Sequence, residues 1–507
     1  MQANPYLKHN SIVFALIFFV ILILHAPLLT LPYFWDEAGH YVPAARDLML
    51  SGDVIPRTTV SNAHPPLPMF YLAAAWSLLG YAPIVTRVAM LLLTAFGLLQ
   101  VFKIGETVAN REVAIGATVC TALYPVIFAQ SSLAHADVMA TALALWGLRL
   151  YLEDRRWSWV AFSLAVLAKE TAILFPVVLL GWTVFKWITK DGALPFRKSS
   201  FLLSMPGVVL ALWFAYHYWR TGFIFGNPEF FRYNVGTTFV PMRIVLAGLR
   251  RLWQVTGYMN LWVLTLSMAA AMMLPALKEG DGERPRIAIL TQILFLMLVL
   301  GHVLGHSLVG GAVLARYMMP AIPLVILICV STLWRRVAQW KWVVGFACIT
   351  FVVGWVVPPL TSFSPEDNLN YASYVRVHQK AAAFLEAKYP KARVLTAWPA
   401  SDEIGHEYLG YVVKPLRTVQ IENFSFDQLL LARQSGDYDV ALLFSTKTPR
   451  HFRWEAWDKA NTQYFDLHDD VSPGVAASLL NGRLVMEASE NGQWVAVMEF
   501  DRIRNGD

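Results

Sequence analysis

Residues 11–37 read SIVFALIFFVILILHAPLLTLPYFWDE, a mostly apolar run over 11–31 that is followed by two adjacent carboxylates, Asp36 and Glu37. A helix needs about 20 apolar residues to cross the hydrocarbon core of a membrane, and this run is long enough. Lys8 precedes the run and no small-residue cleavage site follows it. We therefore interpret it as an uncleaved transmembrane helix rather than a signal peptide.

The composition of the whole chain supports a membrane protein. Of its 507 residues, 56% are apolar and 15% are charged, whereas soluble domains carry about 25% charged residues. Residues 1–360 hold 26 Lys and Arg against 15 Asp and Glu, while residues 361–507 hold 15 against 20. We predict a transmembrane domain over 1–360 and a soluble domain over 361–507. The net charge of +6 does not indicate nucleic-acid binding, because the basic residues lie between apolar runs.

The apolar runs predict a polytopic α-helical membrane protein with about eleven transmembrane helices. The runs cover residues 11–31, 83–102, 113–131, 137–152, 157–168, 171–188, 200–219, 252–275, 287–307, 314–334 and 342–359.

The orientation follows from the short loops, because cytoplasmic loops carry an excess of Lys and Arg. One set of loops holds Lys8, Lys103, Arg111, Arg155, Arg156, Lys186, Lys190, Arg197, Lys198, Lys278, Arg284, Arg286, Arg335, Arg336 and Lys341. The alternate short loops, 132–136 and 169–170, hold a single Lys. We therefore expect a cytoplasmic N-terminus in a plasma (bacterial inner) membrane. The long loops 32–82 (the first outer loop) and 220–251 and the soluble domain 361–507 (the tail) would then lie outside the cytoplasm.

The tail pattern predicts an α/β domain. Helical patterns cover 371–389 and 426–434, strands are predicted at 394–398 and 439–444, and a hairpin of 483–488 with 494–500 turns at Asn491-Gly492. Cysteine indicates neither a disulfide framework nor a thiolate metal site, because Cys120, Cys329 and Cys348 all lie inside apolar runs.

The first outer loop contains the best candidates for chemistry. Asp36 has two interpretations that its position alone leaves open. As an N-cap it would begin an amphipathic segment over 37–50 that Pro43 interrupts and Gly52 ends. As a general base it would have a pKa raised by the low-dielectric membrane surface. The same loop contains His64-Pro65-Pro66, followed by an apolar stretch, 68–79, that is too short to span and is expected to lie along the membrane surface.

Further ionisable residues occur at the outer ends of predicted helices, where charge is costly. Each of them singly is explained by snorkelling or by structural pairing. Together they predict a polar cavity on one membrane face that is able to hold an anion such as a lipid phosphate. They are Arg87, Asp137, Lys169, Glu170 and Arg316.

These residues belong to a series of motifs that resembles a known family. The series resembles the GT-C glycosyltransferases that use a polyprenyl-phosphate sugar, and most closely the protein O-mannosyltransferases and bacterial lipid A aminoarabinose transferases. The likeness covers about residues 10–335. Its motifs are Trp35-Asp36-Glu37, Arg46-Asp47-Leu48-Met49, Ser51-Gly52-Asp53, His64-Pro65-Pro66-Leu67, Thr86-Arg87-Val88, Asp137, Leu167-Ala168-Lys169-Glu170-Thr171, and Arg316-Tyr317 with Pro320.

The resemblance implies a GT-C fold and an inverting sugar transfer at the outer membrane face. Asp36 matches the catalytic base and Glu37 its acidic neighbour, while Arg87, Lys169 and Arg316 match positions that hold the donor phosphate. One motif departs from the aminoarabinose transferases, in which a Glu-Lys pair precedes the two prolines. This chain has Ala63-His64 there, which is closer to the His-Pro-Pro of the mannosyltransferases.

The sequence thus favours a membrane glycosyltransferase with loop 32–82 as its catalytic loop. The donor would be a polyprenyl-phosphate sugar and the acceptor a hydroxyl of a lipid, glycan or protein. Catalytic residues would be Asp36 and Glu37, and substrate-binding residues would be His64, Arg87, Asp137, Lys169, Glu170 and Arg316. No cofactor is required by this chemistry, because cations can neutralise a leaving phosphate, although a divalent ion at Asp36, Glu37 and Asp137 is a second hypothesis. The alternative function is a transporter or flippase for a lipid-linked or anionic substrate.

Overall fold

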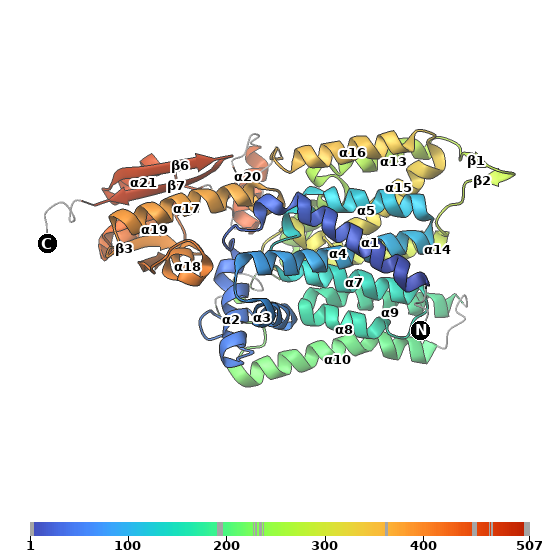
Figure 1. Cartoon of the computed structure of the whole chain (residues 1–507), viewed down its shortest axis with the longest axis horizontal. Coiled ribbons are helices and arrows are strands. Elements are labelled where there is room, and N and C mark those ends of the chain that lie inside the picture. The colour runs from blue at the N-terminus through green and yellow to red at the C-terminus, as the bar shows by residue number, and fades with distance from the viewer. Residues whose placement is uncertain are drawn as a thin grey trace.

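The computed structural model describes residues 5–189, 196–226, 228, 231, 232, 236, 238–359, 364–448, 454–465, 467 and 470–500. Long helices run side by side in a body, and a region with a β-sheet lies at one end of that body (Figure 1). The start of α1 (Pro5–Leu24) lies at the opposite end of the body, the end that also carries the short hairpin of β1 (Lys278–Glu279) and β2 (Gly282–Glu283). The start of α1 and the tail are therefore at opposite ends of the molecule.

The body follows the predicted apolar runs closely. Its helices are α1 (Pro5–Leu24), α2 (Val42–Ser51), α3 (Leu67–Leu79), α4 (Pro83–Val108), α5 (Arg111–Leu123), α6 (Pro125–Gln130), α7 (Ala136–Leu152), α8 (Ser158–Ala168), α9 (Leu174–Ile188), α10 (Phe196–Thr221), α12 (Pro241–Thr256), α13 (Trp262–Met272), α14 (Ile289–Leu308), α15 (Ile322–Arg336) and α16 (Trp340–Gly354).

The number of spans stays a prediction. Within the described residues, four helices are long and apolar enough to cross a membrane, and α12 with α13 forms a fifth such segment if the bent pair counts as one. Several predicted spans are shorter as helices because a proline divides them. The run 113–131, for example, becomes α5 and α6, because Tyr124 adopts an extended conformation before Pro125.

The predicted span 252–275 is wrong as a single helix. The chain bends by 96° between α12 and α13, and Met259 and Asn260 have φ angles of 48° and 67° at the break. Asn260 tolerates the left-handed conformation, and its side chain donates to the carbonyl of Thr350 at 2.7 Å. The apolar composition continues across this break, so composition alone did not reveal it.

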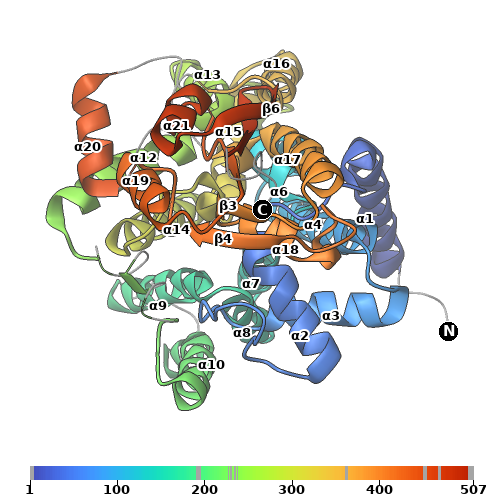
Figure 2. The ribbon, with the colours of Figure 1, turned by 90° about the vertical axis from the view of Figure 1, so that its left-hand side faces the viewer.

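The loop 32–82, which the sequence predicts to be the first outer loop, forms two helices at the tail end of the body. As expected, the segment after Asp36 is divided: a π-helical turn, η2 (Glu37–Tyr41), leads into α2, and α2 ends where Gly52 adopts the left-handed conformation. Helix α3 is seen end-on in Figure 1 and lengthwise in Figure 2, so it runs across the direction of the long helices, as expected for a helix along a membrane surface.

The tail contains a five-stranded sheet in the order β4-β3-β5-β7-β6. Strands β3 (Arg393–Ala397), β4 (Arg417–Ile421) and β5 (Val440–Phe444) are parallel, while β6 (Arg483–Glu490) and β7 (Gln493–Glu499) form the predicted antiparallel hairpin. The predicted turn is confirmed, since Asn491 and Gly492 both have positive φ. The tail helices are α17 (Asn370–Lys388), α18 (Ala400–Gly405), α19 (Phe426–Ser435), α20 (Glu455–Phe465) and α21 (Pro473–Leu480).

The tail packs directly on the first outer loop. The indole of Trp398 lies against Gly39, where a Cβ atom would come within 2.2 Å of its Nε1. Two hydroxyls add hydrogen bonds: Tyr81 donates to the carbonyl of Tyr408 at 2.7 Å, and Tyr411 donates to the carbonyl of Tyr33 at 3.0 Å. The sheet region therefore covers the end of the body at which this loop lies (Figure 2).

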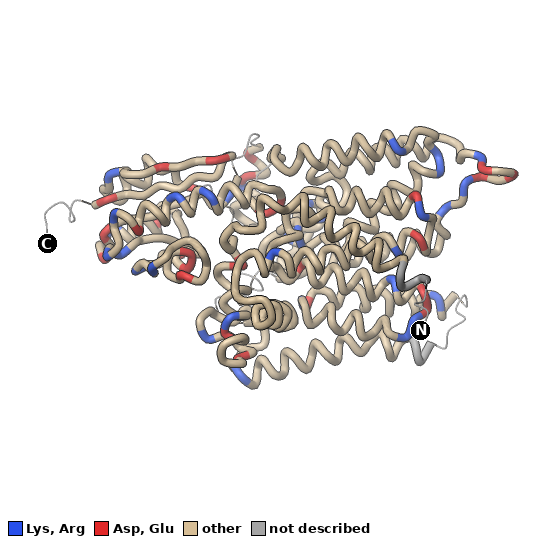
Figure 3. Tube along the Cα trace, in the orientation of Figure 1, with Lys and Arg blue, Asp and Glu red and all other residues tan. Residues whose placement is uncertain are grey.

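The charges of the body gather near the ends of its helices, with long uncharged stretches between them (Figure 3). This is the pattern that membrane-spanning helices require. Which end faces the cytoplasm remains a prediction. Of the residues that support that prediction, Lys190 lies outside the described residues, and so do the side chains of Lys8, Arg197 and Lys198.

Candidate active site

The carboxylates Asp36 and Glu37 point to different partners. The structure contradicts the capping interpretation of Asp36, whose side chain makes no hydrogen bond to the helix that follows it. The neighbouring residue accepts the backbone bonds instead: Glu37 accepts from the amide of Phe34 at 2.9 Å and from that of Ala134 at 2.5 Å. Asp36 is thereby left free to face the centre of the site.

Arg316 is the centre of that site. It lies in a short 3-10 helix, η5 (Ala315–Met318), just before α15. One terminal nitrogen, Nη2, donates to Asp36, and the other, Nη1, donates to Glu366 at 2.7 Å and to the ring of His135 at 2.9 Å. Its Nε lies 3.6 Å from Asp137. One buried guanidinium thus binds two carboxylates directly and lies beside a third.

Lys169 is the second cation of the same cluster. Its Nζ donates to Asp137 at 2.7 Å and lies 4.0 Å from the ring centre of Tyr317. The extended residue Lys169 ends α8 and leads into another 3-10 helix, η3 (Glu170–Ile173). The structure therefore brings Asp36, Asp137, Lys169 and Arg316 together from four separate parts of the chain.

Arg87 and Glu37 form a pair deeper in the body, with side chains that are 1% and 0% exposed. The Arg87 guanidinium donates to Glu37 and to the carbonyls of Ser132 and Pro32, at 3.0 and 2.9 Å. The Arg87 donors are thus used in bonds to other residues of the protein itself. Contact of Arg87 with a donor phosphate stays a prediction. The geometry shows that the pair holds the start of the loop 32–82 in place.

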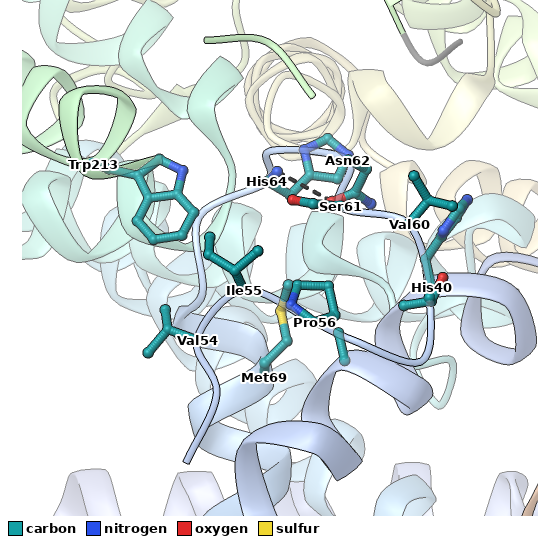
Figure 4. Close-up of a pocket in the computed structure, with 12 residues that line it drawn as sticks. His40, Val54, Ile55, Pro56, Val60, Ser61, Asn62, His64, Met69 and Trp213 are labelled. Atoms are coloured by element: carbon teal, nitrogen blue, oxygen red, sulfur yellow. Dashed lines mark hydrogen bonds between the residues drawn. The ribbon is translucent and has the colours of Figure 1, made fainter. Parts of the chain in front are cut away.

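His64 and Glu170 form a further pair near the surface, 2.8 Å apart. His64 also lines a small pocket between the outer loop and α10 (Figure 4). Ser61, Asn62 and His64 lie on one side of the pocket, and Val54, Ile55, Pro56 and Met69 form its apolar side. The pocket therefore combines polar groups with an apolar wall beside the cluster.

The carboxylates of the site differ in how far solvent reaches them. The Asp36 side chain is 21% exposed, whereas Asp137 and Glu366 are 5% and 3% exposed. Among the carboxylates that touch Arg316, Asp36 is the one that a molecule from outside can reach.

The electrostatics of Asp36 differ from the sequence-based expectation. Burial raises the pKa of this carboxyl, but the charge of Arg316 and its hydrogen bond outweigh burial and leave the pKa below its ordinary value. The predicted upward shift of the pKa is therefore wrong. The reason is the direct bond to Arg316, a residue 280 positions away in the chain.

Two further acids come from the tail, and the sequence analysis missed both. Burial, together with nearby carboxylates, raises the pKa of Glu366 to about 8. Burial also raises the pKa of Asp367 to about 7, although its hydrogen bond from Tyr258 opposes the shift. One signal was available: Glu366-Asp367 follows the last predicted span closely on the same expected side, as Asp36-Glu37 follows the first.

The hypothesis of a divalent ion finds little support in the arrangement of carboxylates. Across the part of the chain that the structure describes, no three His, Cys, Asp or Glu side chains converge as metal ligands. Glu37 bonds Arg87, while Asp137 bonds Lys169, so these two carboxylates have different partners.

Comparison with known proteins gives a fold. No protein-family model matches the chain, and no curated protein matches it by sequence. Two solved structures of ArnT from Cupriavidus metallidurans do match, each over 98% of both chains. The form bound to undecaprenyl phosphate is 13% identical with a TM-score of 0.54, and the apo form is 15% identical with a TM-score of 0.52.

A weaker match is the archaeal oligosaccharyltransferase AglB from Archaeoglobus fulgidus in complex with an inhibitory peptide and a dolichol-phosphate. It is 10% identical, with a TM-score of 0.46 over 85% of this chain and 69% of that one. ArnT and AglB are both GT-C glycosyltransferases. The resemblance to GT-C glycosyltransferases is thus confirmed at the level of the fold. The chain shares this fold with ArnT over nearly its whole length.

Proposed function

We propose that this chain is an integral-membrane glycosyltransferase that moves a sugar from a polyprenyl-phosphate donor to an acceptor hydroxyl. The observation that supports this most is the cluster at the end of the body, where the reachable carboxylate of Asp36 lies on the buried guanidinium of Arg316. A carboxylate that accepts a proton and a cation that neutralises a leaving phosphate are the two groups that this transfer needs. The GT-C fold supports the same function.

In this proposal the donor phosphate is held by Arg316 and Lys169. Both cations are buried, so they interact more strongly with an anion than they would in water. Arg87 and Glu37 fix the loop that presents Asp36, and Asp137 keeps Lys169 in place. His64 and Glu170 border the site on the side of the pocket in Figure 4.

The transfer itself is a single displacement with inversion. Asp36 takes the proton of the acceptor hydroxyl as its oxygen forms a bond to the anomeric carbon. The bond from that carbon to the phosphate oxygen breaks on the opposite face, and its electrons stay on the phosphate. Arg316 and Lys169 then neutralise the charge that develops on the leaving prenyl phosphate.

The membrane setting is part of the same proposal. A prenyl chain would lie in the hydrocarbon layer beside the body, with its phosphate at the end of the helices where the cluster lies. We place this end outside the cytoplasm of a bacterial inner membrane, on the count of basic residues in the short loops. The acceptor would be a lipid, a glycan or a protein.

Mass spectrometry should compare the surface glycans and lipids of cells that carry the gene with those of cells that lack it. A difference between the two would identify the sugar and the acceptor together. Purified protein in proteoliposomes should then transfer that sugar from a labelled polyprenyl-phosphate donor. A transporter or flippase would move the labelled lipid between leaflets without forming a new glycosidic bond, and this result would refute the proposal.

A further inference from the structure

Arg316 has too many acidic partners to receive a phosphate as it stands. Its guanidinium bonds Asp36 and Glu366 and lies beside Asp137. Lys169 is the other cation in this cluster, and it shares Asp137. Three carboxylates therefore lie against Arg316 and Lys169, and a third buried cation, Arg251, lies 5.3 Å from the centre of the Tyr317 ring. A phosphate would add at least one more negative charge to a buried site, which is costly unless another charge is removed.

Glu366 is the carboxylate that competes most directly with a phosphate. Carboxylate and phosphate oxygens bind the same donors of a guanidinium. Glu366 Oε2 accepts from Arg316 Nη1 at 2.7 Å, while its second oxygen, Oε1, is buried without a hydrogen-bond partner among the described residues. It therefore occupies donors of Arg316 that a phosphate would need.

The position of Glu366 is fixed by its backbone and its neighbours. It lies in the 3-10 helix η6 (Pro365–Asp367). Gln130 donates to the carbonyl of Glu366 at 3.1 Å, Tyr258 donates to Asp367 at 2.7 Å, and Asn368 donates to the carbonyl of Gly354 at 3.3 Å. These bonds tie the turn to three parts of the body, so the carboxylate is held in the cluster.

We propose that Glu366, when ionised, is a counter-ion that occupies the phosphate-binding side of Arg316, and that a prenyl phosphate can take this side only once the carboxylate has taken up one proton. This inference rests on the proposed function, since it takes Arg316 as the phosphate-binding cation. The proton comes from water, and Glu366 changes from a carboxylate to a carboxylic acid. Asp36 keeps its charge and remains available as the base.

The surroundings of Glu366 agree with this exchange. The groups that face it are Arg316 from η5, His135 and Asp137 at the start of α7, Asp36 before η2, and its neighbour Asp367. Burial raises the pKa of Glu366 to about 8, because the nearby carboxylates add to the effect of burial and Arg316 offsets only part of it. Burial lowers the pKa of His135 well below its ordinary value, so this ring adds no charge near neutral pH.

The test is the pH dependence of undecaprenyl phosphate binding to the purified full chain in detergent. The phosphate has a second pKa of about 6, so its charge is nearly constant between pH 7.5 and 9.5. If binding takes up one proton at Glu366, wild-type affinity should fall about tenfold per pH unit above about pH 8, because only the protonated fraction is competent. An affinity that stays constant up to pH 9.5 would overturn the proposal.

Glu366→Gln keeps the shape of the side chain but removes its charge. Its affinity for undecaprenyl phosphate should stay constant with pH. At pH 9 it should exceed the wild-type affinity about tenfold, because only about one wild-type molecule in ten then carries a protonated Glu366. Asp367→Asn is the matched control, because this acid lies in the same turn but bonds Tyr258 rather than Arg316, and it should keep the wild-type slope. A wild-type slope in Glu366→Gln would place the titration elsewhere and overturn the proposal.

Two outcomes separate this inference from the proposed function. Arg316→Ala should bind undecaprenyl phosphate much more weakly, and unchanged binding would overturn the inference at its premise. Sugar transfer by the wild-type chain tests the function independently of either variant. The slope of the wild-type chain needs no substitution, so the inference is tested even if Glu366→Gln fails to fold.

Discussion

Asp36→Asn is the substitution that best separates a catalytic from a structural role for the first outer loop. Asn has the shape of Asp and caps helices about as well, but it cannot take a proton from an acceptor. Because the Asp36 side chain makes no cap hydrogen bond, a loss of turnover cannot be attributed to a lost cap. General-base catalysis is worth about 10²–10⁴-fold, which corresponds to about 3–5 kcal/mol of activation free energy.

The expected cost in stability is smaller, for a reason visible in the cluster. Removing one partner of a buried ion pair costs about 3–5 kcal/mol when the other charge is left alone. Arg316 is not left alone in this variant, since Glu366 still accepts from it at 2.7 Å. We therefore expect Asp36→Asn to fold and to bind donor at least as well as the wild type.

The assay is sugar transfer in proteoliposomes, with donor affinity and melting temperature measured on the same preparations. Asp53→Asn is the matched control: it makes the same chemical change in the same loop, where Asp53 bonds Ser51 and Arg57 rather than Arg316. Turnover by Asp36→Asn within about threefold of the control, far less than the loss expected of a base, would refute the role of Asp36 as the base.

Three other predictions test the buried Glu37–Arg87 pair, the contact between the tail and the first outer loop, and the membrane topology. Glu37→Gln should lower the melting temperature strongly while folded molecules keep most of their turnover, because it breaks a pair with Arg87 that is almost fully buried; normal stability with lost turnover would instead make Glu37 catalytic. Gly39→Ala should loosen the tail, measured by limited proteolysis, because its Cβ would overlap Trp398, whereas the same change at Gly181, where nothing lies within 4 Å of a Cβ atom, should have no effect. Reporter fusions after Arg156, Lys198 and Arg336 should be cytoplasmic and one at Asp507 external, and the reverse pattern would invert the topology.

Much of the site could be predicted because each member has a local signal. Asp36, Asp137, Lys169 and Arg316 are all ionisable residues at the ends of apolar runs, where charge is expensive and therefore informative. The alternation of basic and non-basic short loops then predicts that these ends lie on one side of the membrane. Sequence reasoning of this kind predicts which charged residues lie at the same end of the body. The structure brings these four residues together at one end, as predicted.

The pairing of charges could not be predicted, because it depends on how the helices pack. Arg87 and Arg316 look alike as basic residues near helix starts, yet one bonds Glu37 deep in the body and the other bonds Asp36 and Glu366. The sign of the Asp36 pKa shift depends on the same unpredicted contact. For the same reason the bend at Met259 and Asn260 was missed, since tertiary contacts such as the bond from Asn260 to Thr350 stabilise it.

The low pKa of Asp36 gives the cluster a consequence for the order of events in the proposed reaction. A carboxylate bonded to a guanidinium is a weak base, because the cation stabilises its charged form. When a phosphate shares Arg316, part of that stabilisation is withdrawn and the pKa of Asp36 rises. Asp36 thus becomes a better base once the donor has bound. In the proposed reaction, the bond to Arg316 that keeps Asp36 ionised would therefore also make its strength as a base depend on whether the donor phosphate is bound.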